Sequence, residues 1–335
     1  MHERVLFIVF VLFFSCTNRE RMARQQLVKG NFAFEEGRYE EAVRYFREAT
    51  HNDSLNAEAW NNLGLAHLKQ DESDPARFAF ARAIMLDPTA GEALLNHART
   101  GLHLHQYFSV LQDMDDLDRI WPDSSIILFT RGLCFHAMGR LDQALGVFQQ
   151  ALRADPDNYE SYINIGSVLY QMDRLDSAEW YSWKGLSINS QEANGYNTLS
   201  LIYLKKMEWE RALVLVDSAL KLSPGQPYYL NNKGQIEMAM GHYSSAESLF
   251  NQSMRIDPYN ARVYRNKGIL MLKNNRPNEA VRLIAKALQL GPASPDMKLD
   301  LATAYLANDE GEKACNLLND VTTPAAEHFK VQNCQ

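Results

Sequence analysis

A column of asparagines spaced by multiples of 34 residues carries the most distinctive polar chemistry of the chain. An asparagine amide both donates and accepts hydrogen bonds, so a row of amides can bind a polypeptide main chain without reading its side chains. The alternative is that asparagine is merely frequent at this place and touches no ligand. The column consists of Asn62, Asn96, Asn164, Asn232 and Asn266, with Thr130 and Thr198 at intermediate positions, and its polar neighbours are Asn61, Asn197, Asn231, Gln235 and Arg265.

No motif in the sequence announces catalysis or metal binding. It contains no His-Glu-x-x-His, no Gly-x-Ser-x-Gly, no phosphate-binding glycine loop and no Cys-x-x-Cys. His103 and His105 are two residues apart, so on a helix they point in different directions and cannot share a metal ion. We therefore expect a protein that is not an enzyme and has no cofactor, metal site or catalytic residue.

The charge balance argues against a nucleic-acid partner. The chain has 335 residues, of which 34 are Lys or Arg and 41 are Asp or Glu, so its formal net charge is −7. Binding to nucleic acid needs a Lys/Arg-rich face that displaces counterions from the phosphates, and no such face or tail is evident. We expect no nucleic-acid binding.

Three further residue types recur every 34 residues and show which elements position the asparagines. A glycine in a helix interior costs about 1 kcal/mol relative to alanine, so a recurring one indicates close helix packing. Proline ends a helix because it has no N–H and disfavours a helical residue before it. The recurring positions are Gly30, Gly64, Gly132, Gly166, Gly234 and Gly268; Ala42, Ala76, Ala144, Ala178, Ala212, Ala246, Ala280 and Ala314; and Pro88, Pro122, Pro156, Pro224, Pro258 and Pro292.

Each 34-residue unit is therefore predicted to be a helix, a turn and a second helix. A lone helix pair cannot bury its apolar stripe, but a stack of pairs can. Residues 23–294 hold eight such units without an insertion, and a ninth, degenerate or capping unit is expected at 295–321. Residues 322–335 are expected to form a C-terminal tail.

This pattern resembles the tetratricopeptide repeat over almost the whole chain. The resemblance implies an all-α fold, a right-handed superhelical solenoid of antiparallel helix pairs. It also implies that first helices line a concave groove and second helices form the convex back. The second unit is closest to the family motif, with Trp60, Leu63, Gly64, Ala76, Phe80, Ala83 and Pro88 at its signature positions.

The same resemblance places the asparagine column in the groove. It is similar to the asparagine ladder of O-linked GlcNAc transferase, which holds extended polypeptide by its main chain. Some family members instead clamp a terminal carboxylate with paired Lys and Asn, but Leu27 and Asn61 occupy the Lys places here. A chaperone-tail adaptor is therefore disfavoured.

The N-terminus is predicted to be an export signal, residues 1–15. The apolar run Val5 to Phe14 is too short to span a bilayer and fits the core of a signal peptide. The run ends in Ser15 and Cys16, which resembles the lipobox of bacterial lipoproteins. That resemblance implies acylation of Cys16, a lipidated linker at 16–22, and, without an Asp after Cys16, an outer membrane location facing the periplasm. The alternatives are a conventional cleaved signal or an uncleaved short anchor.

Two further features remain open in the sequence. Trp180, Tyr181 and Trp183 fall on one second helix, where they either form a convex contact with a partner or are covered by a bend of the stack. Cys315 and Cys334 either form a disulfide or remain unpaired thiols. Asp113 and its acidic neighbours are expected on a solvated face.

These observations predict a lipid-anchored scaffold whose groove binds extended segments of envelope proteins and assists assembly, secretion or turnover. The alternative is a structural subunit of a secretion or motility complex that docks through its convex face. An enzyme built in the groove is the third and least favoured interpretation. A self-complementary face would also permit a homodimer.

Overall fold

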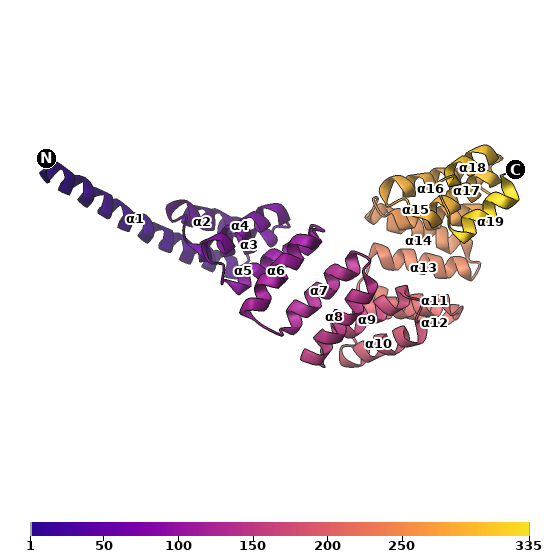
Figure 1. Ribbon diagram of the computed structural model, residues 1–335, viewed down its shortest axis with the longest axis horizontal. Coiled ribbons are helices and arrows are strands. Elements are labelled where there is room, and N and C mark those ends of the chain that lie inside the picture. The colour runs from indigo at the N-terminus through magenta and orange to yellow at the C-terminus, as the bar shows by residue number, and fades with distance from the viewer. Residues whose placement is uncertain (1, 335) are drawn as a thin grey trace. The chain divides into compact units, whose positions relative to one another are not determined.

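The computed structural model describes the backbone of residues 2–334 and the side chains of residues 18–334, and in this part of the chain it contains nineteen α-helices and no strand. The all-α solenoid predicted from the sequence is thereby confirmed. The chain divides into two compact bodies, Met1–Ser161 and Tyr162–Gln335. Within each body, successive helices pack side by side as antiparallel pairs (Figure 1).

The N-terminal body is built from four helix pairs. In each pair the first helix packs more extensively against its own second helix than against the helices of the next pair, as in a stack of helical repeats. The pairs are α1 (His2–Glu35) with α2 (Tyr39–Asn52), α3 (Ala57–Leu68) with α4 (Ser73–Leu86), α5 (Gly91–His103) with α6 (Tyr107–Ile120), and α7 (Ser125–Ala137) with α8 (Leu141–Ala154).

The C-terminal body continues the same succession of helices. The first of them, α9 (Tyr159–Gln171), begins just before the boundary between the bodies. The others are α10 (Leu175–Ile188), α11 (Ala193–Lys205), α12 (Trp209–Leu222), α13 (Pro227–Ala239), α14 (Tyr243–Ile256), α15 (Ala261–Lys273), α16 (Pro277–Leu290), α17 (Pro295–Ala307), α18 (Gly311–Leu318) and α19 (Pro324–Asn333).

The recurring alanines and glycines have the packing roles predicted for them. Every residue of the alanine series, including Val110 at its one exception, is 0% exposed. The glycines lie where the two helices of a pair touch. A methyl group at Gly64 would lie 2.6 Å from Cε1 of Phe80, and Phe80 is itself fully buried. Glycine is therefore required at this crossing because the phenylalanine ring occupies the place of a side chain.

The recurring prolines end the second helices as expected. The residue before each proline is not helical, and most are extended, for example Asp87 with φ −136° and ψ 93°, and Asp257 with φ −126° and ψ 90°. Proline disfavours a helical conformation in the residue that precedes it, so the helix stops there.

The turn inside each pair follows a further 34-residue series that the sequence interpretation missed. One residue in each turn has positive φ, as in Gly37, Asp71 and Met207. This left-handed conformation closes the first helix, where glycine is favoured and asparagine or aspartate is tolerated. The complete series is Gly37, Asp71, His105, Gly139, Asp173, Met207, Gly241, Asn275 and Asp309.

Both terminal segments, which the sequence predicted to be a signal peptide with its linker and a tail, contain helices. The helix α1 includes residues 2–22, which fall in the predicted signal peptide and linker, and the side chains of Cys16 and its predecessors lie outside the description. The predicted tail at 322–335 contains α19, which packs against α17 and α18. Within the described part of the chain, no helix combines the length and apolar character that crossing a bilayer requires.

Candidate functional site

The asparagine column lies on first helices, as predicted, but its amides bind one another. Asn96 Nδ2 donates to Asn61 Oδ1 at 3.4 Å, and Asn232 Nδ2 donates to Asn197 Oδ1 at 2.8 Å. Asn266 Nδ2 donates in the same way to Asn231 Oδ1 at 2.9 Å. The two asparagines of each pair are 35 residues apart in the sequence, so each bond joins the first helices of two neighbouring repeats. The column therefore forms hydrogen bonds that link neighbouring repeats, which the sequence interpretation did not anticipate.

Other side chains fill the same place where an asparagine is missing. In the first repeat Leu27 stands at the acceptor position, and Asn62 Nδ2 donates instead to Asn31 Oδ1 at 3.0 Å. In the last repeats Arg265 donates to the carboxylate of Asp300. Burial raises the pKa of Asp300 above its ordinary value, although Arg265 opposes this shift. An ion pair therefore replaces the amide pair at the C-terminal end of the series.

The column members differ in how far they reach solvent. Asn231 is only 2% exposed and Asn232 is 9% exposed, whereas Asn61, Asn62 and Asn96 are half-buried. Thr130 donates to a carbonyl of its own helix and is buried, and Thr198 is buried too. Asn164 also takes part in an interaction. Asn164, Asn197 and Asn266 are half-buried as well, so Asn231 and Asn232 are the asparagines of the strip that are shielded from solvent.

The polar neighbours extend the strip along the helices. Asn61 Nδ2 donates to Asn62 Oδ1 at 3.4 Å, and Asn231 Nδ2 donates to Asn232 Oδ1 at 3.3 Å. Gln235 Nε2 reaches the same Asn232 oxygen at 3.4 Å. These bonds are long and weak, as is the bond from Asn96 to Asn61, so the half-buried amides of the N-terminal body retain hydrogen-bonding capacity.

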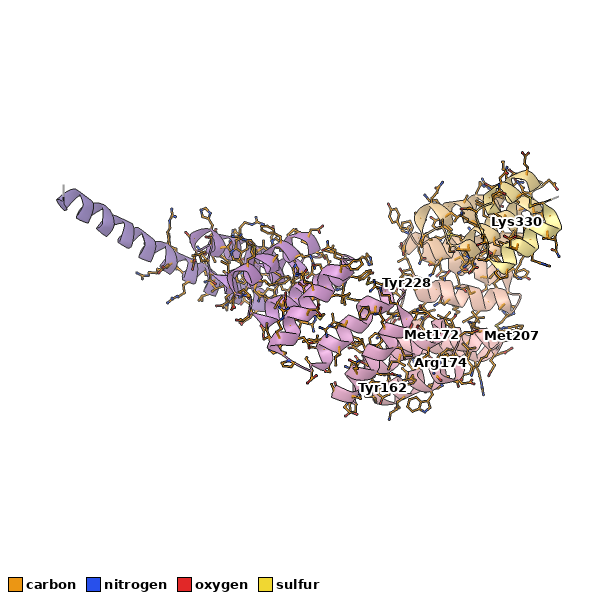
Figure 2. All side chains as sticks on the ribbon, in the orientation of Figure 1. Tyr162, Met172, Arg174, Met207, Tyr228 and Lys330 are labelled. Carbon is orange, nitrogen blue, oxygen red and sulfur yellow. A yellow bond between two sulfur atoms is a disulfide. The ribbon has the colours of Figure 1, made fainter. Side chains whose placement is uncertain are left out.

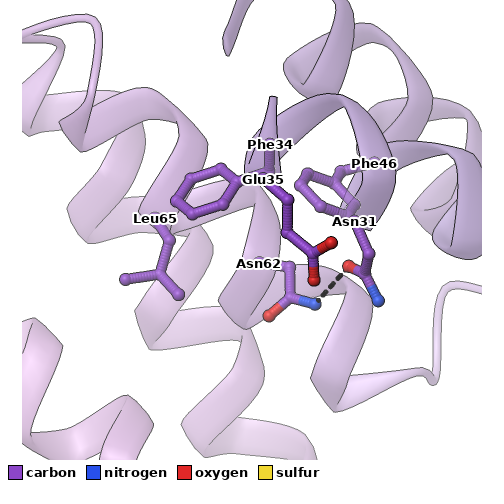
Figure 3. Close-up of a pocket in the computed structure, with 6 residues that line it drawn as sticks. All are labelled: Asn31, Phe34, Glu35, Phe46, Asn62 and Leu65. Atoms are coloured by element: carbon purple, nitrogen blue, oxygen red, sulfur yellow. Dashed lines mark hydrogen bonds between the residues drawn. The ribbon is translucent and has the colours of Figure 1, made fainter. Parts of the chain in front are cut away.

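A hollow with a volume of about 240 Å³ adjoins the first of these amide pairs (Figure 3). Phe34, Phe46 and Leu65 supply its apolar walls, and Asn31, Asn62 and Glu35 supply its polar groups. Three helices contribute to it: α1, α2 and α3. The hollow joins a pair of amides, a carboxylate and an aromatic wall within one small space.

Comparison with known proteins identifies the family. Models described as tetratricopeptide repeat or TPR repeat match residues 27–93, 132–173, 227–260 and 271–333. The chain belongs to the tetratricopeptide-repeat family. The solved structure of the APC/C hetero-tetramer Cut9–Hcn1 is similar to it with a TM-score of 0.63 and 16% identity, covering 83% of this chain and 55% of that one. This similarity shows the shared fold.

Curated relatives of this tetratricopeptide-repeat protein are longer and distant in sequence. Protein CTR9 homolog of Arabidopsis thaliana is 22% identical over 315 residues, which cover 81% of this chain and 29% of that protein. Protein O-mannosyl-transferase TMTC3 of Homo sapiens is 24% identical over 311 residues, which cover 87% of this chain and 34% of that protein. The chain thus spans about a third of the length of these relatives.

The tryptophans of α10 are exposed, so the expected bend of the repeat stack does not cover them. Trp180 is 58% exposed and Trp183 is 42% exposed. Tyr181 packs edge-on against Trp180, with ring centroids 4.9 Å apart, and also lies against Tyr162. Together with Asp176, Glu179 and Lys184, the two tryptophans line an open hollow on the second helix of this repeat.

Charges beside these tryptophans are paired within the protein. Lys206 donates to Asp176 and to Glu179, each at 2.7 Å, and the Tyr203 hydroxyl donates to Glu179 at 2.6 Å. Burial alone would raise the pKa of Glu179, but the hydrogen bonds from Lys206 and Tyr203 hold that pKa below its ordinary value. The carboxylates near Trp180 therefore stay ionised and fixed in place.

One histidine and one acidic residue of this tetratricopeptide-repeat protein, His97 and Asp113, are structural partners. His97 and Asp113 are nearly buried and lie 2.7 Å apart, so the prediction of a solvated Asp113 is wrong. The prediction failed because His97 of the preceding helix turns inward to meet it. Within the described residues no group of His, Cys, Asp and Glu could hold a metal ion.

The cysteines divide into a bonded pair and a buried thiol. Cys315 and Cys334 form a disulfide that joins α18 to the residue after α19, which resolves the alternative left open by the sequence. Cys134 is 0% exposed, as expected for a residue close to the packing glycine Gly132. Burial raises the pKa of the Cys134 thiol to about 12, and the nearby Asp113 adds to this shift. A thiol in this state is unreactive.

Proposed function

We propose that this protein is a scaffold that binds extended segments of other proteins along the asparagine strip of its first helices. The observation that carries the proposal is the half-buried run Asn61, Asn62 and Asn96, whose amides keep hydrogen-bonding capacity beyond their bonds to each other. An amide row of this kind pairs with main-chain N–H and C=O groups of any sequence. Tetratricopeptide repeats are generally non-enzymatic scaffolds, and the similar Cut9–Hcn1 structure is a hetero-tetramer.

The proposed location is a bacterial envelope, with the chain anchored to the outer membrane through acyl chains on Cys16. The apolar run before Cys16 and its small neighbour Ser15 support this location. The disulfide between Cys315 and Cys334 supports it independently, because disulfides persist in oxidising compartments and are rare in the cytosol. The bound segments would then belong to envelope proteins during assembly, secretion or turnover.

Main-chain binding is tested with an array of short random-sequence peptides and the same peptides N-methylated at alternate backbone amides. We expect the retained peptides to share no side-chain motif and to lose binding when they are N-methylated. Asn61→Ala/Asn96→Ala should weaken their binding about tenfold, because it removes two hydrogen bonds to the peptide main chain. Asn232→Ala is the matched control, since it removes the same kind of bond between repeats at a buried site. Binding that survives both N-methylation and the double substitution would refute the proposal.

Anchoring is tested separately by feeding the native host an alkyne-tagged fatty acid. The wild-type chain is expected to carry the label and Cys16→Ser is expected to lose it. An unlabelled wild-type chain that is still exported would mean a conventional signal peptide instead.

The exposed tryptophans favour one second candidate, a structural subunit that docks through α10. Their exposed fractions of 58% and 42% leave an apolar surface of the kind found at protein interfaces. If Trp180→Ala/Trp183→Ala releases the protein from a native complex while Asn61→Ala/Asn96→Ala does not, this second candidate replaces the first.

A further inference from the structure

The hollow between α1, α2 and α3 is sized for one side chain. Its volume is about 240 Å³, below the range of about 300–1,000 Å³ that is usual for sites that enclose a whole small molecule. Phe34 and Leu65 form apolar walls on one side of it (Figure 3). Walls of this kind contact the aliphatic stem of a long side chain. The hollow also opens beside Asn31 and Asn62, so an extended segment bound along the asparagine strip passes over it.

The charge at this hollow is negative and unbalanced. Glu35 is exposed, and no hydrogen bond or ion pair reaches its carboxylate from any described residue. The two neighbouring carboxylates, Glu36 and Glu41, are both paired with Arg38. No cationic side chain lines the hollow. An acidic or phosphorylated ligand would therefore be repelled here, whereas a cation would be attracted.

The acceptors around the hollow suit a cation with several N–H donors. Asn62 Nδ2 is already used in its bond to Asn31, which leaves the Asn62 oxygen to accept from a ligand in addition to its 3.4 Å bond from Asn61. Figure 3 shows the Glu35 carboxylate on the same side as these amides. A carboxylate and an amide oxygen together accept two or more N–H bonds, which an ammonium or guanidinium group supplies.

We propose that this hollow binds a lysine or arginine side chain of the extended segment held along the asparagine strip. The stem lies between Phe34 and Leu65, and the cationic head binds Glu35 and the Asn62 oxygen. This inference rests on the proposed peptide binding and adds a side-chain preference at one place in an otherwise main-chain interaction.

The test uses the peptides retained by the random array that contain one lysine. Each is compared with the same peptide carrying norleucine, which keeps the stem and removes the charge. For the wild-type protein we expect norleucine to weaken binding by about twofold to fivefold, the range of an exposed ion pair. With Glu35→Gln the two peptides should bind equally. With Glu35→Lys a glutamate at the same peptide position should bind better than lysine.

Glu20→Gln is the matched control. It removes one exposed carboxylate from the same helix, far from the hollow, and Glu20 makes no hydrogen bond or ion pair with any other described residue. The lysine preference should persist in this variant. If it is lost there too, the preference reflects the net charge of the protein and the assignment to Glu35 is wrong.

A second measurement separates this inference from the proposed function. Side-chain amide NMR signals of Asn31 and Asn62 are followed while Nα-acetyl-lysine methylamide or its norleucine analogue is added. Shifts with the lysine compound alone support the site, even if no array peptide binds. If array peptides bind yet lysine and norleucine are indistinguishable in both experiments, the inference fails and the peptide scaffold remains.

Discussion

Two alanine substitutions in one helix pair should have clearly different effects on stability. Gly132 on α7 faces Phe148, and a methyl group there would lie 2.5 Å from Cε1 of that ring. Gly146 on α8 has no atom within 4 Å of the place where its methyl group would be. Both are helix-interior glycines, so both substitutions gain about 1 kcal/mol of helix propensity. That gain cancels when the two variants are compared.

The difference between the variants therefore measures the overlap alone. Carbon atoms in contact normally lie about 3.5–4.0 Å apart, so Phe148 would have to move by about 1 Å. It is 0% exposed and its ring lies against Phe129, with centroids 5.7 Å apart, so it has no free space to enter. Overpacking of this kind costs about 1–3 kcal/mol. We expect Gly146→Ala to stabilise by about 1 kcal/mol and Gly132→Ala to be less stable than Gly146→Ala by about 1–3 kcal/mol.

The assay is hydrogen exchange of α7 and α8, supported by urea unfolding. Local protection is preferred because repeat arrays need not unfold as a single cooperative unit. Adding Phe148→Leu to Gly132→Ala should recover part of the loss, since the smaller side chain makes room for the methyl group. If Gly132→Ala proves as stable as Gly146→Ala, the recurring glycines are not required by the phenylalanine contact and that explanation of the series is wrong.

Three further outcomes follow from the turns and cysteines. Met207→Gly should raise the free energy of unfolding by about 1 kcal/mol, because the methionine is held at φ 62° and is exposed (Figure 2); a lower urea midpoint would contradict this. Cys134 should resist alkylation in the folded protein at about pH 8.5 and react on unfolding. Its pKa is raised to about 12, so the free energy of unfolding should also fall between about pH 9 and pH 12, where only the unfolded thiol loses its proton. Reducing the Cys315–Cys334 disulfide should lower hydrogen-exchange protection of α19 while α11 and α12 stay unchanged, and uniform loss along the C-terminal body would contradict coupling between neighbouring repeats.

The packing of each repeat was predictable from the sequence because it depends on local periodicity. An alanine that recurs every 34 residues must occupy the same environment in each repeat, and all members are indeed fully buried. The turn series was equally visible in principle, since Gly37, Asp71 and Asn275 are residue types that tolerate positive φ. His105 and Met207 hid it, because neither type suggests a left-handed turn.

The partners of polar side chains were less predictable. Periodicity places Asn96 and Asn61 on neighbouring helices, but whether their amides meet depends on the offset between those helices. The bonds connect residues 35 apart rather than 34, so a comparison of equivalent positions could not find them. Asp113 was misassigned for a related reason: the acidic run around it suggested solvent, while its partner His97 lies on the preceding helix.

The same residue type thus has two roles within one column. Asn231 and Asn232 are almost excluded from solvent and their amides hold neighbouring repeats together, so removing either leaves a buried group without a partner, at a cost of about 1–3 kcal/mol. Asn62 and Asn96 make equivalent bonds but are only half-buried, and Asn62 borders the hollow of Glu35. Substitutions at Asn231 and Asn232 should therefore report on stability, and those at the half-buried Asn62 and Asn96 should report on binding.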